Sequence, residues 1–158
     1  MTTVFEPHWV LLQESMVADL KPGDVLRRRK TGVWHLGVYV GLGEVLHNTP
    51  GVGAGEQLVP YKVFACGREV YVAHSNPETR AAVMERASGV LAHPRAYSYV
   101  WRNCEHTVYE IVEGIPRSPT VKMMDTVLTC ATVLALACLA YSFRREIGTS
   151  AGKLIGRS

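Results

Sequence analysis

The chain has 158 residues, of which 47% are hydrophobic and 20% are charged, and its formal net charge is only +3. This length allows one domain with its own core but hardly two, and the charge gives no argument for a nucleic-acid partner. The 4 cysteines have neither CxxC spacing nor the density of a disulfide-rich secreted domain. We therefore expect free thiols in a reduced, intracellular chain, and the N-terminus lacks the pattern of a secretory signal.

The first half of the chain predicts a meander of three antiparallel strands. The turn sequence Lys21-Pro22-Gly23-Asp24 precedes a strand that starts at Val25. Residues 34–40 alternate between apolar and other side chains, and Gly41-Leu42-Gly43 connects them tightly to a third strand at residues 44–47. Residues 48–55, rich in glycine, read as a loop. Residues 69–73 and 97–101 predict two further short extended segments.

Two helices are predicted after the strands. The first covers residues 78–91 and turns Val83, Ala87 and Val90-Leu91 toward the core. The second runs from Asn103 to about Glu113 and ends at Gly114, a residue that favours the left-handed conformation found after helices.

The C-terminal part is the most apolar segment of the chain. Residues 126–143 contain no charged side chain, and 18 helical residues span about 27 Å, close to the thickness of a hydrocarbon core. A buried core helix is the alternative, but the segment has no polar face and follows a complete domain. We predict one globular domain over residues 1–118, a hydrophobic membrane-anchor helix over 119–145 and a basic flexible tail over 146–158.

Basic residues and cysteines bear on localisation. The run Arg27-Arg28-Arg29-Lys30 is either a solvated face or a patch attracted to anionic lipid. The tail carries more Lys and Arg than the upstream flank, so the positive-inside rule places the tail in the cytoplasm, where the free thiols place the domain as well. A single span cannot place both the tail and the domain in the cytoplasm. A short translocated end, or a segment that dips into one leaflet, resolves this conflict. We predict an intracellular membrane with the domain facing the cytoplasm.

Two histidines precede a cysteine that opens a helix. Strand alternation puts His35 on the face of Gly37 and Tyr39, and a hairpin brings His47 on the next strand within reach of it. A single histidine is more often structural, but two on adjacent strands with a distant cysteine indicate a catalytic set.

Cys104 follows Asn103, a strong N-cap residue, so its thiol lies in the first turn of the helix. A buried cysteine that merely packs is the alternative. The helix N-terminus and a nearby imidazolium would favour the thiolate. The Cys104 N–H, with Tyr39 as a second donor, would hold an oxyanion. These parts predict acyl-transfer chemistry without a cofactor or metal ion.

The remaining polar residues near this block read as structural. His106 and Glu105 lie on the same helix as the cysteine and point away from it or cap it, and His74 and His93 lie in loop contexts that face solvent.

Four sequence blocks together resemble the lecithin:retinol acyltransferase-like group, nearest to the phospholipase A and acyltransferase family, over about residues 20–118. The blocks are Gly23-Asp24-Val25-Leu26, His35-x-Gly-Val-Tyr39-Val40-Gly41, Val45-Leu46-His47 and Asn103-Cys104-Glu105-His106. The resemblance implies a permuted papain-like α+β domain with an antiparallel sheet and packed helices. Thr107 stands where that family usually has an aromatic residue.

The resemblance also implies roles and partners. Cys104 would be the nucleophile, His35 the general base and His47 the third polar residue of a triad. The substrate would be a glycerophospholipid in a bilayer, and water, an amine or a lysolipid would accept the acyl group from an acyl-cysteine. Two other functions stay open: a non-catalytic, membrane-anchored interaction module, and a papain-like peptidase or amidase.

Overall fold

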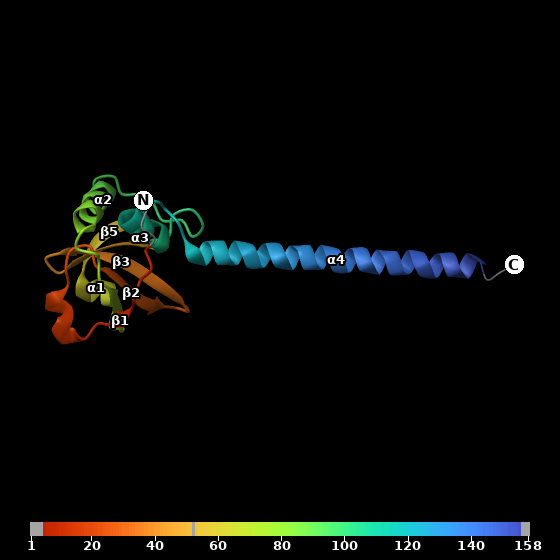
Figure 1. Cartoon of the computed structure of the whole chain (residues 1–158), viewed down its shortest axis with the longest axis horizontal. Coiled ribbons are helices and arrows are strands. Elements are labelled where there is room, and N and C mark those ends of the chain that lie inside the picture. Colours follow the sequence, from red (N-terminus) through yellow and green to blue (C-terminus); the bar gives the residue numbers. More distant parts are fainter. Residues whose placement is uncertain (1–4, 52, 156–158) are drawn as a thin grey trace. The chain divides into compact units, whose positions relative to one another are not determined.

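A computed structural model describes residues 5–51 and 53–155 of the chain. The chain divides between Ser118 and Pro119 into two compact units. The first unit is α+β, and the second contains the long helix α4, which spans Pro119–Ile155 (Figure 1).

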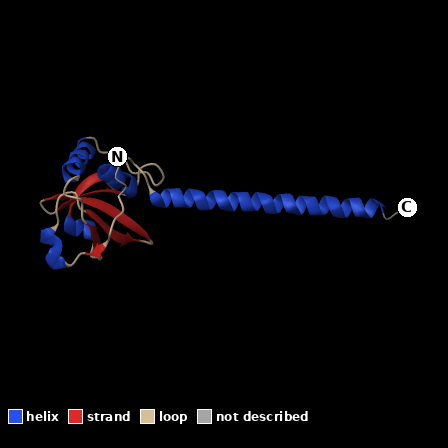
Figure 2. Ribbon diagram, viewed as in Figure 1, coloured by secondary structure: helices blue, strands red, loops and turns tan. Residues whose placement is uncertain are grey.

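Among the described residues, six strands form one sheet in the order β1-β6-β2-β3-β4-β5, and every neighbouring pair is antiparallel (Figure 2). The strands are β1 (Val10–Leu11), β2 (Val25–Lys30), β3 (Val33–Gly41), β4 (Glu44–Thr49), β5 (Gly55–Pro60) and β6 (Val70–Ala73). The helices of this unit are the 3₁₀ helix η1 (Glu14–Asp19), α1 (Tyr61–Ala65), α2 (Arg80–Ala92) and α3 (Cys104–Glu113).

The predicted meander is confirmed as β2, β3 and β4. Gly41 and Gly43 both have positive φ in the turn between β3 and β4, and this conformation costs glycine little. The register pairs Gly37 with His47. His47 therefore lies opposite a residue that is only two positions from His35 on the adjacent strand.

The sheet has an apolar layer on each face, and successive residues of β3 alternate between the two layers. Leu36 and Val38 belong to a core that includes residues of α2 and α3, among them Val83 and Val108. Tyr39 belongs to a second core on the opposite face, and this core includes Phe64 of α1. The strand therefore contributes to two cores, with His35 on the side of Tyr39.

The structure departs from the sequence predictions at two places in this unit. Residues 55–60, the first of which belongs to the predicted loop, form β5, which pairs with β4 along its whole length. Residues 97–101, predicted to be extended, fold instead into a turn that a backbone bridge between Ser98 and Arg102 closes. Two backbone hydrogen bonds of 2.9 and 3.0 Å join these two residues, and they outweigh the β preference of the aromatic side chains.

Helix α4 contains the apolar segment. Its part from Pro119 to Leu139 is long and apolar enough to cross a membrane, and none of it is buried within the protein. The helix continues to Ile155, so residues 146–155, for which the sequence predicts a flexible tail, are helical here.

Candidate active site

His35 and His47 form a buried pair between β3 and β4, which we call the histidine pair. The Nε2 atom of His35 lies 2.8 Å from the Nδ1 atom of His47. Only 3% of His35 and 6% of His47 is exposed. The ring of His35 stacks on Phe64 at a centroid distance of 5.6 Å. The sequence prediction that a hairpin joins these two imidazoles agrees with this geometry.

Both members of the histidine pair are uncharged near neutral pH. Burial, followed by the charges of His47, Arg28 and Lys30, lowers the pKa of His35 to about 3. Burial, followed by the charges of Arg28 and Lys30, lowers the pKa of His47 to about 4. A neutral imidazole has one N–H and one lone pair, so one ring donates and the other accepts across the 2.8 Å contact.

Asn103 fixes the start of α3, as its sequence position predicts. Its side-chain oxygen accepts hydrogen bonds from the N–H groups of Glu105 at 3.0 Å and His106 at 3.1 Å. The side chain of His106 accepts in return from the N–H of Asn103, which completes a capping box. At the other end, Gly114 has a φ of 81° and closes the helix as predicted.

Cys104 is the first residue of α3 and lies against the strand that carries His35. Its Sγ atom lies 3.9 Å from the carbonyl oxygen of Trp34, and the N–H of Leu36 also faces the sulfur. These are the residues directly before and after His35. In the described chain, the pairing of β3 with β4 starts at Gly37, so the edge of β3 beside His35 is open to the N-terminus of α3.

The Cys104 side chain is buried and uncharged. Burial raises the pKa of its thiol, the charge of Glu105 raises it as well, and backbone N–H groups of Leu36, Glu105 and Cys104 offset this in part. The sequence pattern predicts a thiolate stabilised by a nearby imidazolium. That expectation is wrong for this structure, because the histidines lose their protons far below neutral pH. The resting state is a thiol beside a neutral imidazole.

Among the described residues, the hydrogen bond of the Cys104 thiol goes to the Trp34 carbonyl and none joins it to His35. The structure thus joins the two histidines directly and places the thiol beside the backbone of the first. The Nε2 atom of His47 has no partner among these residues.

The predicted second oxyanion donor, Tyr39, lies elsewhere. Its hydroxyl accepts a hydrogen bond of 3.0 Å from the N–H of Gly43, at the turn between β3 and β4. Tyr39 lies five residues further along the strand than Trp34, a distance of about 16 Å. Tyr39 therefore does not reach the thiol, and we correct its role to that of a core residue that stabilises the turn.

The sequence analysis missed a buried polar network behind the site. The carboxylate of Glu56 accepts from the Thr107 hydroxyl at 2.8 Å and from Arg102 at 2.6 Å. The side-chain amide of Asn48 donates to the Thr107 hydroxyl at 3.1 Å. Because Asn48 follows His47 on β4 and Thr107 lies one turn after Cys104 on α3, the network ties the two halves of the site together. Glu56 lies in the strand that the sequence did not predict.

The basic run on β2 is only partly a solvated face. Arg28 is buried and its side chain donates to the carbonyl oxygen of Phe64. The guanidinium of Arg27 lies 4.2 Å from the ring centres of both Trp9 and Trp34. These two arginines therefore pack within the domain. His74, by contrast, is exposed as predicted, although its Nδ1 atom lies 3.0 Å from Asp24.

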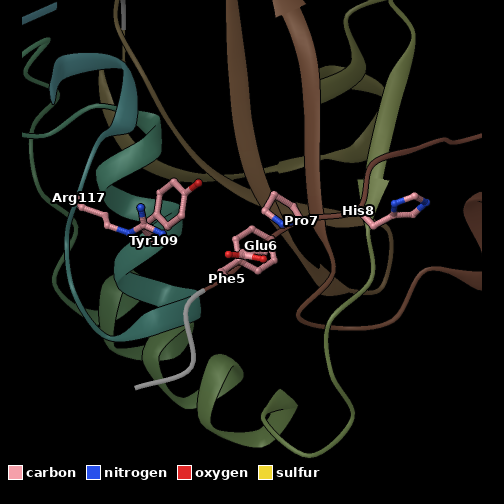
Figure 3. A pocket seen from close by; sticks show the side chains of 6 residues that line it. All are labelled: Phe5, Glu6, Pro7, His8, Tyr109 and Arg117. Carbon is pink, nitrogen blue, oxygen red and sulfur yellow. The ribbon is translucent and has the colours of Figure 1, made fainter. Parts of the chain in front are cut away.

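The first unit carries a surface pocket of about 530 Å³ (Figure 3). Its lining residues are Phe5, Glu6, Pro7, His8, Tyr109 and Arg117. The guanidinium of Arg117 lies 4.0 Å from the ring centre of Tyr109. The histidine pair and Cys104 do not line this pocket, so it is separate from the candidate site. Among the described residues, no group of three or more His, Cys, Asp or Glu side chains is placed to hold a metal ion.

Comparison with known proteins identifies two relatives. Phospholipase A and acyltransferase 3 from Mus musculus is 27% identical over 127 residues, which cover 67% of this chain and 78% of the mouse protein. Phospholipase A and acyltransferase 4 from Homo sapiens is 27% identical over 150 residues, which cover 79% of this chain and 91% of the human protein. No protein-family model matches the chain. The similarity to these two proteins confirms the family resemblance that the sequence motifs indicate.

Proposed function

We propose that this chain is a phospholipid-modifying enzyme that transfers acyl groups through a thioester on Cys104, as a phospholipase A and acyltransferase. The observation that carries the proposal is the 2.8 Å contact of the histidine pair next to a cysteine at a helix N-terminus. The names of the two relatives support a phospholipid substrate. A permuted papain-like arrangement, with the histidines before the cysteine in sequence, is part of this proposal.

His35 is the general base and His47 orients it. We assign the tautomer in which the Nε2–H of His35 donates to the Nδ1 of His47, because this leaves a lone pair on the Nδ1 atom of His35. The thiol of Cys104 needs a change of side-chain rotamer to turn from the Trp34 carbonyl toward this atom. Catalytic hydrogen bonds often tighten only when substrate is bound.

The first half-reaction forms the thioester. As the sulfur attacks the ester carbonyl carbon, the thiol proton moves to the Nδ1 atom of His35. The carbonyl oxygen becomes an oxyanion, which the N–H of Cys104 stabilises, because the N–H groups of Glu105 and His106 already donate to Asn103. The C–O bond then breaks, and the imidazolium gives its proton to the leaving alkoxide, so that a lysolipid departs and the acyl group stays on sulfur.

The second half-reaction returns the enzyme to its starting state. Water, an amine or a lysolipid hydroxyl attacks the thioester carbonyl and gives its proton to His35. The C–S bond breaks, and the proton passes back to sulfur. In each half, His35 is briefly charged in a buried place, and the Nδ1 atom of His47 stabilises that charge because it accepts the hydrogen bond from the Nε2–H.

The catalytic domain would be residues 1–118, and α4 would hold it at an intracellular membrane with the domain on the cytoplasmic side. The support is the apolar part of α4, Pro119–Leu139. An anchor of this kind raises the concentration of the site at the surface where the substrate lies. Digestion of the domain by protease added to intact microsomes supports this orientation, and protection of the domain contradicts it.

The test compares two cysteine variants of the full-length chain in phosphatidylcholine vesicles. Cys104→Ser is expected to lower fatty-acid release by about a thousandfold or more, because the nucleophile is lost. Cys66→Ser is the matched control, because Cys66 is an exposed free cysteine, and it is expected to keep full activity. Equal activity of both variants contradicts the mechanism. Cleavage of peptides but not of lipid esters would instead select a peptidase.

A further inference from the structure

The turn just before the candidate nucleophile carries three exposed hydrophobic side chains. We call residues 98–102 the aromatic turn. The exposed fractions are 71% for Tyr99, 50% for Val100 and 81% for Trp101. Exposing a Tyr, a Val and a Trp side by side is unfavourable in water unless another surface covers them.

The aromatic turn is rigid at its base. Backbone hydrogen bonds join Ser98 and Arg102 in both directions, and the N–H of Trp101 donates to the Ser98 hydroxyl at 3.2 Å. The Arg102 side chain is held by the buried carboxylate of Glu56 at 2.6 Å. The turn thus presents its three side chains in a fixed position outside the domain.

Asn103 connects the aromatic turn to the last residue of the domain. Its side-chain amide donates to the carbonyl oxygen of Tyr99 at 3.2 Å and to the Ser118 hydroxyl at 3.1 Å. The chain continues from Ser118 directly into the apolar part of α4 at Pro119. The turn, the start of the helix that carries Cys104 and the point where the domain meets the apolar segment are therefore neighbours.

A second exposed segment lies near the thiol. The carbonyl of Trp34 contacts Cys104, and the residue before it, Val33, is 53% exposed at the end of the hairpin between β2 and β3. The same hairpin end carries the basic residues Arg29 and Lys30. Apolar tips with basic residues beside them match a phospholipid surface, whose headgroup region is anionic and whose interior is apolar.

We propose that the aromatic turn inserts into the interfacial region of a phospholipid bilayer and so brings the N-terminus of α3, which carries Cys104, to the membrane. Tyr and Trp are the side chains that favour this region, because each combines a large apolar ring with one polar group. This inference rests on the proposed function, since it names the bilayer as the partner of the same site. It adds to the apolar helix a second contact with the bilayer, and this contact fixes the orientation of the domain on the membrane surface.

The direct test measures whether Trp101 touches lipid. The full-length chain with Cys104→Ala, which leaves the lipids intact, is placed in phosphatidylcholine and phosphatidylserine vesicles that contain phospholipids brominated on their acyl chains. Bromine quenches tryptophans that it contacts, and the chain has 3 tryptophans. In the Cys104→Ala background, Trp101→Phe is expected to remove more than half of the emission that bromine can quench. Trp9→Phe, the matched control, is expected to leave the quenchable emission unchanged. Unchanged quenching in Trp101→Phe overturns the proposal.

An activity measurement tests the consequence. Trp101→Gln is expected to lower the ratio of vesicle hydrolysis to hydrolysis of a monomeric short-chain ester by about tenfold, because a buried aromatic contact with lipid is lost. Leu42→Gln is the control, because Leu42 is fully exposed on the turn between β3 and β4. An equal fall in both variants, or none in either, contradicts a specific docking turn. If quenching depends on Trp101 but fatty-acid release does not depend on Cys104, the results support the docking surface and contradict the proposed enzyme activity.

Discussion

At the scale of single residues, the site depends on groups that are kept uncharged. His35 and His47 are buried against each other and against Phe64, and positive charges on Arg28 and Lys30 act on both. A base of low pKa and a thiol of raised pKa form a neutral pair. The thiolate therefore forms only as the reaction proceeds, and no ion pair has to be maintained in the resting protein.

The buried histidines make stability depend on pH. Their pKa values, about 3 and about 4, lie below the unfolded value near 6.5, so the unfolded chain binds protons first as the pH falls. Each histidine is expected to lower the free energy of unfolding by about 1.4 kcal/mol per pH unit below about pH 6. Urea unfolding between pH 7 and about 4.5 measures this slope. His47→Gln is expected to reduce the slope, and His93→Gln, at an exposed position, is expected to leave it unchanged.

The two histidines are expected to differ in kinetics. His35→Gln removes the base and is expected to lower kcat for ester hydrolysis about as much as Cys104→Ser does. His47→Gln keeps an oxygen that can accept the Nε2–H of His35, so a smaller loss of about 10- to 100-fold is expected. Single-turnover rates on vesicles decide the order. A larger loss for His47→Gln than for His35→Gln reverses our assignment of roles.

Gly37 lets β3 approach its neighbours beside the histidine pair. A Cβ atom at this position would lie 2.7 Å from Cγ1 of Val45 and 2.9 Å from Cε2 of Phe64. Gly37→Ala is expected to destabilise the domain by about 1–3 kcal/mol, because both neighbours are buried and must shift. Gly89→Ala makes the same change in α2, where nothing lies within 4 Å, and is expected to stabilise by up to about 1 kcal/mol. Urea unfolding of both variants checks the opposite signs.

At the scale of secondary-structure elements, the sequence predicts the helices and strands that local chemistry determines. The cap at Asn103, the stop at Gly114 and the strand that carries His35 all follow from residue types and spacing, and the structure has all three. Strand β5 and the aromatic turn are different, since they depend on partners distant in the chain. The carboxylate of Glu56 is explained only by the arginines and the hydroxyl that the fold brings to it, and no local pattern in the sequence marks the strand that carries it.

The cap of α3 gives a prediction at this scale. Asn103→Ala removes a side chain that accepts two backbone hydrogen bonds and donates to Tyr99 and Ser118, and at least about 1 kcal/mol of stability is expected to be lost. Thr79 is the matched control, because it occupies the N-cap position of α2 without a side-chain capping bond. Thr79→Ala is expected to cost clearly less in the same urea titration. Equal losses would show that the capping box contributes little.

At the scale of the whole molecule, an α+β domain and an apolar helix lie in one chain. The apolar residues of α4 from Pro119 to Leu139 are exposed along its length, which in water is unfavourable. Residues that flank the thiol, on the aromatic turn and on the hairpin between β2 and β3, are apolar and exposed as well. A bilayer accounts for both observations at once.

The helix gives the prediction at this scale. We expect full-length protein to stay with the membrane fraction after extraction with alkaline carbonate. Leu134→Lys together with Leu136→Lys is expected to shift it to the supernatant, since each lysine at the centre of a span costs about 3 kcal/mol. Lysine at Leu42, outside the helix, is the control and is expected to have no effect. Extraction of the unaltered chain by carbonate contradicts a spanning helix.

The most direct test of the account is mass spectrometry of the protein after brief incubation with vesicles of mixed phospholipids. We predict that the peptide containing Cys104 gains the mass of a fatty acyl group, that hydroxylamine removes this group, and that His35→Gln prevents its formation. Lipid cleavage without any acyl group on Cys104, or an acyl group found equally on Cys66, would contradict the proposed thioester mechanism.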